Sequence, residues 1–146
     1  MISVERALIE DAEFFARLEQ GTDTKQYILP YTEAEHARRI LDPSFVYLRI
    51  LDAGKLAGFF ILVLDSDRSS VEFRRIVVSD KGKGIGQSAI AAMEQFCRTE
   101  LQRTRVWLDV FEYNSRGRHV YEKLGYERYG ENNHESGKLL LYQKRL

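Results

Sequence analysis

The chain has 146 residues, and its 22 lysines and arginines balance its 22 aspartates and glutamates, so its formal net charge is +0 at pH 7. This length suits one domain with one core, and the charge balance argues against a nucleic acid or an anionic membrane as partner. No apolar run approaches membrane-spanning length, the N-terminus lacks a signal-peptide pattern, and a single cysteine permits no internal disulfide. These features favour a cytoplasmic protein.

The first thirty residues predict a strand, a helix and an irregular segment. The strand begins at Ile2, where apolar and polar residues alternate. Asp11 is a candidate N-cap for the helix, which Gly21 ends. Residues 21–31 show no periodicity, so we expect them to be irregular.

A second helix and a hairpin are expected next. Thr32 followed by Glu35 is the pattern of a capping box at a helix start, and Pro43 ends this helix. The segments 45–51 and 56–64 then predict two strands joined by a tight turn, since a turn-forming Asp-Ala-Gly-Lys stretch separates them.

The centre of the chain holds its most informative pattern. Residues 71–78 predict a buried strand, and apolar residues recur at helical spacing over 85–101. Between them stands the sequence Ser-Asp-Lys-Gly-Lys-Gly-Ile-Gly-Gln over 79–87. Glycines leave backbone N–H groups uncovered where a helix begins, and two lysines add positive charge. This stretch therefore predicts a site for a phosphorylated ligand.

Two other phosphate-binding patterns fit this stretch poorly. A Walker motif requires Gly-Lys-Ser/Thr, whereas Gly86 is followed by Gln87 and Ser88. A dinucleotide-binding motif requires G-x-G-x-x-G, whereas Gly82, Gly84 and Gly86 are spaced by two. The remaining alternative is a glycine-rich connection without a ligand.

The last part of the chain predicts a strand, a helix and two more strands. The strand covers Arg105–Phe111, and the helix begins at Asn114 or Ser115 and stops at Gly125. The final strands are expected over 126–130 and 138–144, with a polar segment, 131–137, between them. The fold class expected is α+β: a mixed, mostly antiparallel sheet of about six or seven strands with helices on both faces.

Two motifs resemble those of the GNAT superfamily of N-acetyltransferases. The pyrophosphate loop of that family reads Gln/Arg-x-x-Gly-x-Gly/Ala at the start of its third helix; Lys81, Gly84 and Gly86 fall on those positions, with lysine replacing the usual Gln or Arg. The stretch 108–126 resembles the family's fifth strand, an asparagine, and a helix ending in Tyr-Glu-x-Leu-Gly-Phe/Tyr. The resemblance implies one GNAT domain over residues 1–146.

The resemblance also implies acetyl-CoA as cosubstrate. In the family, the pantetheine arm lies between the fourth and fifth strands, and the backbone groups for it would here belong to Ile76, Val77 and Val78. The pyrophosphate would be held by the stretch Lys81, Gly82, Lys83, Gly84, Ile85, Gly86 and Gln87. Asn114 is expected to bond the CoA arm, with helix capping as the competing role.

Acyl transfer to an amine requires a base, since an alkyl amine with a pKa near ~10 is protonated at neutral pH. Glu72 and Asp109 lie where different family members carry one. The competing interpretation is that each faces solvent or pairs with a neighbouring arginine such as Arg74. By the strand period of two, Glu72 is expected to share a face with Arg74, Ile76 and Val78.

The proton donor implied by the resemblance is Tyr121, seven residues after Asn114. The competing role for this tyrosine is packing on an amphipathic helix. No metal is expected, because His36, His119 and His134 lack metal-ligand spacing and are interpreted as surface residues.

The acceptor is expected to contact two irregular segments. Tyr27 and Tyr31 are candidate substrate residues in the first, and the second holds Glu131, His134 and Glu135. Acids and aromatics would suit a cationic amine. We therefore expect acetyl transfer from acetyl-CoA to a small-molecule or peptide amine in a ternary complex. The alternative is a module that binds acyl-CoA without transferring it; a homodimer is also possible.

Overall fold

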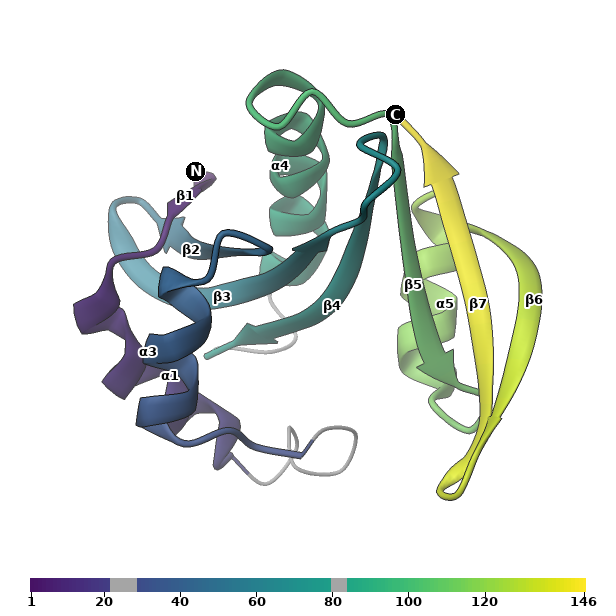
Figure 1. Ribbon diagram of the computed structural model, residues 1–146, viewed down its shortest axis with the longest axis horizontal. Coiled ribbons are helices and arrows are strands. Elements are labelled where there is room, and N and C mark those ends of the chain that lie inside the picture. Colours follow the sequence, from purple (N-terminus) through teal and green to yellow (C-terminus); the bar gives the residue numbers. More distant parts are fainter. Residues whose placement is uncertain (22–28, 80–83) are drawn as a thin grey trace.

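The computed structural model describes residues 1–21, 29–79 and 84–146. Within these ranges the chain forms a seven-stranded sheet in the order β1-β2-β3-β4-β5-β7-β6. Helices cover both faces (Figure 1), which confirms the expected α+β class. None of the helices in the described ranges is long and apolar enough to cross a membrane. Four residues predicted for the site, Tyr27, Lys81, Gly82 and Lys83, lie outside the described ranges.

The sheet is mixed, as expected. Its strands are β1 (Ile2–Arg6), β2 (Phe45–Asp52), β3 (Lys55–Leu64), β4 (Ser70–Val78), β5 (Arg105–Phe111), β6 (Glu127–His134) and β7 (Gly137–Arg145). The helices are η1 (Ile9–Asp11), α1 (Ala12–Glu19), α3 (Glu33–Leu41), α4 (Ile85–Thr99) and α5 (Ser115–Lys123). The pair β4–β5 is parallel, and the other neighbouring strands run antiparallel.

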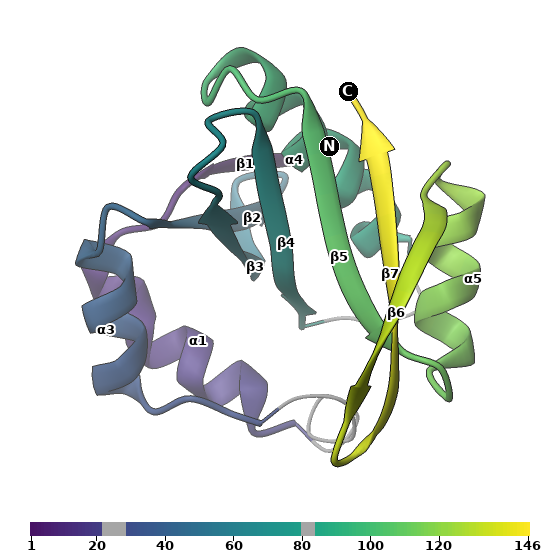
Figure 2. The same cartoon turned by 45° about the vertical axis from the view of Figure 1, so that its right-hand side comes forward.

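Two apolar clusters hold the helices to the sheet. On one face, α4 contributes Met93 and Cys97 to a large core shared with β2 to β5 and β7. Burial raises the pKa of the Cys97 thiol to about 12, so this thiol is uncharged in the core near neutral pH. On the opposite face, Phe15 of α1 stacks on Phe59 of β3 with ring centroids 4.2 Å apart. Figure 2 shows α1 and α3 on this second face, and α5 lies behind β5 and β7 in Figure 1.

The helix ends predicted from local sequence were mostly confirmed. Thr32 and Glu35 form the predicted capping box, and Gly125 ends α5 with φ +95°, a backbone conformation that glycine adopts without strain. Asp11 does precede α1, but its side chain makes no cap bond to that helix. Its Oδ2 instead accepts from the backbone N–H of Leu8 at 2.8 Å and closes the η1 turn.

The prediction of a polar loop over 131–137 was wrong. Strand β6 continues to His134, and β7 begins at Gly137. Seven of the eight residues of β6 are exposed, because β6 is the edge strand of the sheet. The strand therefore shows no alternation of apolar and polar residues. Periodicity therefore gave no sign of this strand, and backbone pairing with β7 determines it.

A β-bulge corrects the expected face of Glu72. Ile61 pairs with Arg75 but Leu62 pairs with Phe73, so Arg74 is an extra residue in β4. Ile76 and Val78 consequently join the same core as Phe73. Glu72 precedes Phe73 and points to the opposite face, away from Ile76 and Val78. Counting by twos failed because the alternation shifts at Arg74.

Candidate active site

The sheet opens between its two central parallel strands. Pairing of β4 with β5 consists of three residue pairs, Ser70 with Arg105, Val71 with Val106 and Glu72 with Trp107. Beyond Glu72 the strands diverge (Figure 1), and no described strand pairs with the edge of β4 that faces β5. The predicted residues 76–78 lie on this part of β4. Their backbone groups can therefore bond an extended ligand that enters the opening.

The helix that follows β4 offers backbone donors. Gly84 is the N-cap of α4, has φ +75° and makes no side-chain cap bond, and the first turn holds no acidic residue. A Cβ at Gly86 would meet nothing within 4 Å, so the start of α4 is open. The N–H groups of residues 85–87 and the positive end of the helix dipole suit a diphosphate. The described part of the predicted loop thus fits the diphosphate of CoA.

Tyr121 projects from α5 toward β4. Its ring lies edge-on to Phe73 of β4 at 5.8 Å and to Tyr126 at 6.0 Å between centroids. Burial raises the pKa of Tyr121 to about 12, and the negative charge of Asp109 on β5 adds to the shift. The phenol is therefore protonated near neutral pH and has a proton to donate there.

The two candidate bases have different surroundings. Glu72 is held by Arg74 through two bonds, Nε to Oε2 at 3.1 Å and Nη2 to Oε1 at 2.9 Å. Asp109 has no ion pair with any residue in the described ranges. Although part of the residue is exposed, desolvation raises the pKa of Asp109. The charge of Glu72 raises it further, against the opposing effects of Arg74 and His134.

Asn114 caps α5. Its Oδ1 accepts from the backbone N–H of Gly117 at 3.0 Å. A Cβ at Gly117 would lie 2.9 Å from Asn114 Nδ2, so the cap depends on glycine there. The capping role is thus present, and the contact with the CoA arm stays a prediction.

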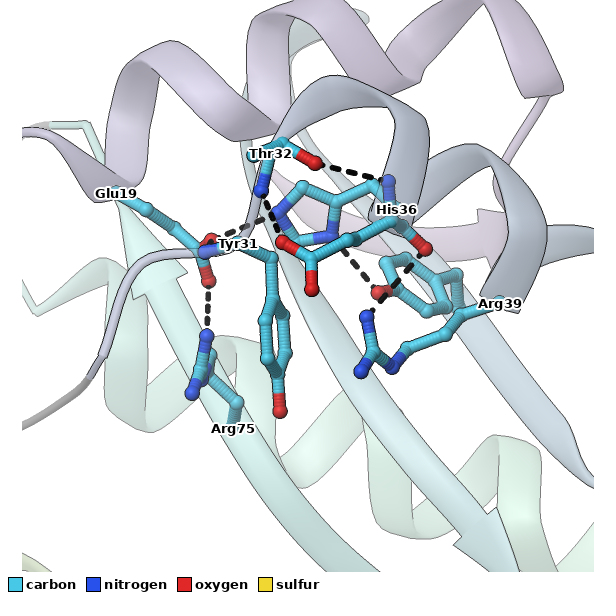
Figure 3. A network of polar contacts seen from close by, with 8 residues as sticks. Glu19, Tyr31, Thr32, His36, Arg39 and Arg75 are labelled. Carbon is cyan, nitrogen blue, oxygen red and sulfur yellow. Dashed lines mark hydrogen bonds and ion pairs between the residues drawn. The ribbon is translucent and has the colours of Figure 1, made fainter.

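A buried polar network, which the sequence did not reveal, joins α1 and α3 to β4 (Figure 3). Glu19 Oε1 accepts from His36 Nε2 at 2.7 Å and from the N–H of Tyr31 at 2.9 Å, and Oε2 accepts from Arg75 Nη1 at 2.6 Å. His36 Nδ1 also meets the Tyr47 hydroxyl at 2.8 Å. His36 is 0% exposed, so its interpretation as a surface residue was wrong. Its position four residues before Ile40, on the apolar side of α3, was the available signal.

The glutamate of this network is charged. Burial acts to raise the pKa of Glu19, but the hydrogen bonds from His36, Tyr31 and Arg75 outweigh it and lower the pKa. A buried carboxylate with this many donors fixes the groups around it. The network therefore sets the position of Tyr31 and Arg75 beside the bulge of β4.

The candidate residues of the second predicted acceptor segment, Glu131 and His134, have different surroundings. Glu131 forms exposed ion pairs with Arg128 and Lys138. His134 lies edge-on to Phe111 at 5.6 Å, and its Nδ1 accepts from the backbone N–H of Ser136 at 3.0 Å. His134 thus lies within electrostatic reach of Asp109, whereas Glu131 pairs at the exposed edge of the sheet.

An open sheet before a helix N-terminus, with a protonated tyrosine at the opening, is the arrangement of CoA-dependent acetyltransferases. The chain belongs to the acetyltransferase (GNAT) family, whose model matches residues 7–126. No sequence among the curated proteins matches this chain.

Solved structures show the same fold. The spermidine N-acetyltransferase of Vibrio cholerae in complex with CoA and spermine is 22% identical, with a TM-score of 0.84 over 99% of this chain and 95% of that one. The aminoglycoside acetyltransferase AAC(6')-Ib in complex with coenzyme A and kanamycin is 16% identical, with a TM-score of 0.85 over 99% of this chain and 95% of that one. The similarity to both extends over nearly the whole length of this chain.

Proposed function

We propose that the protein transfers the acetyl group of acetyl-CoA to a primary amine by direct attack in a ternary complex. The observation that carries the proposal is the end of β4–β5 pairing after Glu72, with Tyr121 and Asp109 near the opening. Family membership supports it, as do the related structures that hold CoA with spermine or kanamycin.

The donor would lie along the open edge of β4. Backbone groups of Ile76, Val77 and Val78 would bond the pantetheine arm, and N–H groups of Gly84, Ile85, Gly86 and Gln87 would bond the diphosphate. Lys81, Gly82, Lys83 and the amide of Asn114 complete the proposed set. This binding would place the thioester between β4 and β5, near the Tyr121 hydroxyl.

Asp109 is the base that we propose. The Glu72 carboxylate is engaged in two bonds with Arg74, whereas Asp109 has no such partner among the described residues. The charge of Asp109 also contributes to the raised pKa of Tyr121. A carboxylate with a raised pKa is a better proton acceptor than an ordinary one. Glu72 would then orient Arg74 and contribute negative charge.

In the proposed transfer, Asp109 and Tyr121 handle the protons. Asp109 takes a proton from the acceptor ammonium, directly or through a water, and the nitrogen lone pair attacks the thioester carbonyl carbon. The C–N bond forms and the C–S bond breaks, and the Tyr121 O–H gives its proton to the departing sulfur. The nitrogen loses its second proton as the tetrahedral intermediate collapses, and this proton reaches the tyrosinate through solvent. Asp109 releases the first proton to solvent.

Thiol release from acetyl-CoA across a panel of primary amines tests the function, with calorimetric titration of CoA beside it. We expect CoA to bind and at least one amine to release thiol. Binding without release from any amine would favour the module that holds acyl-CoA without transfer. An absence of CoA binding at millimolar concentration would contradict both.

A further inference from the structure

Three arginines gather on two aromatic rings beside the site. The Arg39 guanidinium lies 3.8 Å from the ring centroid of Tyr31 and 5.9 Å from that of Phe45. Arg75 lies 4.3 Å from the Tyr31 ring, and Arg74 lies 5.6 Å from the Phe45 ring. The sequence suggested acids and aromatics here, for a cationic acceptor. The structure instead surrounds Tyr31 with positive charge.

Two of the three charges are balanced. Arg74 is paired with Glu72, and Arg75 is paired with the buried Glu19. Arg39 has no ion pair with any residue that the structure describes. Arg39 is therefore the member of the group that has no carboxylate in ion-pair contact, and the Glu35 carboxylate acts on it only at longer range.

The donors of Arg39 are largely unused. Its one hydrogen bond within the described ranges is a long one, from Nη1 to the carbonyl oxygen of Glu35 at 3.4 Å. The Glu35 carboxylate is turned to the helix cap, where it accepts from the N–H of Thr32 at 2.9 Å. Contact with the Tyr31 ring supports the guanidinium and leaves hydrogen-bond donors for a ligand. In Figure 3 the Arg39 guanidinium lies beside the Tyr31 ring.

Arg74 connects the three arginines to the strands that hold the candidate base. Arg74 bonds Glu72, which is the last residue of β4 that pairs with β5. The pairing partner of Glu72 is Trp107, and Asp109 follows two residues later on the same face of β5. Arg74 thus links the arginine group to the opening between β4 and β5. A molecule whose amine reaches Asp109 can extend past Arg74 toward Arg39.

We propose that the acceptor carries a carboxylate, which Arg39 binds while the amine of the same molecule reaches Asp109. The proposal rests on the proposed function and names the acceptor class for it: an amino carboxylic acid, free or as part of a peptide. A planar guanidinium bonds a carboxylate through two parallel N–H donors. An unbalanced guanidinium would repel a polycation, in contrast to the spermine and kanamycin held by the related structures.

The test compares matched pairs of amines in the thiol-release assay. Glycine, β-alanine, 4-aminobutanoate and 6-aminohexanoate each face the plain alkylamine with the same number of carbons. We expect at least one acid to exceed its alkylamine in kcat/KM by about tenfold or more, as a charge-assisted pair allows. In Arg39→Gln that ratio should fall to about one, and Arg39→Lys should keep part of it.

Arg38→Gln is the matched control, since Arg38 is the exposed neighbour on α3; it should keep the wild-type ratio. A ratio near one in the wild type, with alkylamines still acetylated, would overturn the carboxylate proposal and leave the acetyltransferase proposal standing. A preference for 1,4-diaminobutane or for aminoalkyl phosphates over every acid would also overturn the carboxylate proposal. The same holds if Arg39→Gln lowers kcat/KM equally for the acid and the alkylamine of a pair. Failure of every amine with bound CoA would instead refute the proposed function itself.

Discussion

Replacing Tyr121 by phenylalanine should separate chemistry from stability. The variant keeps the ring contacts with Phe73 and Tyr126, and the hydroxyl has no hydrogen-bond partner among the residues that the structure describes. Its loss therefore leaves no buried donor or acceptor unpaired. We expect the free energy of unfolding to change by less than about 0.5 kcal/mol.

The catalytic effect of the same change should be large. A positioned proton donor contributes about 10²- to 10⁴-fold to rate, so kcat should fall by at least about 100-fold, while the Kd for CoA stays the same. Because burial raises the pKa of Tyr121 to about 12, only about 1% of it is ionised at pH 10, where a free tyrosine is about half ionised. The wild-type kcat should therefore show no fall from Tyr121 ionisation between about pH 8 and pH 10.

Tyr126→Phe is the matched control. The Tyr126 hydroxyl donates to Glu94 Oε2 at 2.8 Å, and the residue is buried. Its removal should cost about 1–2 kcal/mol in unfolding free energy, or about 2–8 °C in Tm, and leave kcat unchanged. Thiol release and urea unfolding measure the two effects. Activity of Tyr121→Phe within about threefold of wild type would refute its role as proton donor, and a larger stability loss there than in Tyr126→Phe would refute the structural reasoning.

Three further changes test other parts of the site. Asp109→Asn should lower kcat/KM by about 100-fold and abolish the acidic limb of the pH–rate profile; because the pKa of Asp109 is raised, that limb should lie above pH 3.8 in the wild type. Gly58→Ala should lower Tm and weaken CoA binding, because a Cβ there would lie 2.2 Å from the backbone oxygen of Val77; unchanged melting and titration curves would contradict this. Glu19→Gln should cost about 3–5 kcal/mol in urea unfolding at neutral pH. Since hydrogen bonds, His36 first, outweigh burial and lower the pKa of Glu19, the wild type should lose this stability as pH falls below 4.5 toward the folded pKa, and the variant should not.

The sequence predicted those parts of the fold that depend on local chemistry. The capping box at Thr32 and the helix stop at Gly125 each depend on a few consecutive residues, and both were found where expected. The cap at Asn114 is likewise local. Tyr121 could be predicted as a site residue because it stands seven residues after Asn114 within one motif. Such features can be predicted because the residues that form them are close in sequence.

Features that depend on distant partners were missed. Strand β6 is set by its pairing with β7, and its exposed residues carry no periodic signal. The buried His36 is satisfied by Glu19, which lies on another helix and accepts its hydrogen bond. The residues next to His36 in sequence do not indicate that partner. The same holds for Arg39, which we propose as the carboxylate-binding residue because it has no ion pair among the described residues. Pairing between elements thus decides what periodicity leaves open.

The bulge in β4 explains how a central strand carries two consecutive arginines. In a regular strand Arg74 and Arg75 would point to opposite faces, and Arg75 would enter the apolar core that holds Phe73. The extra residue at Arg74 turns both guanidiniums to the face of α1 and α3, where Glu72 and Glu19 pair with them. It also returns the next residues of β4 to the core. One irregularity in pairing therefore avoids a buried unpaired charge and places both arginines, each with its carboxylate partner, beside the opening of the sheet.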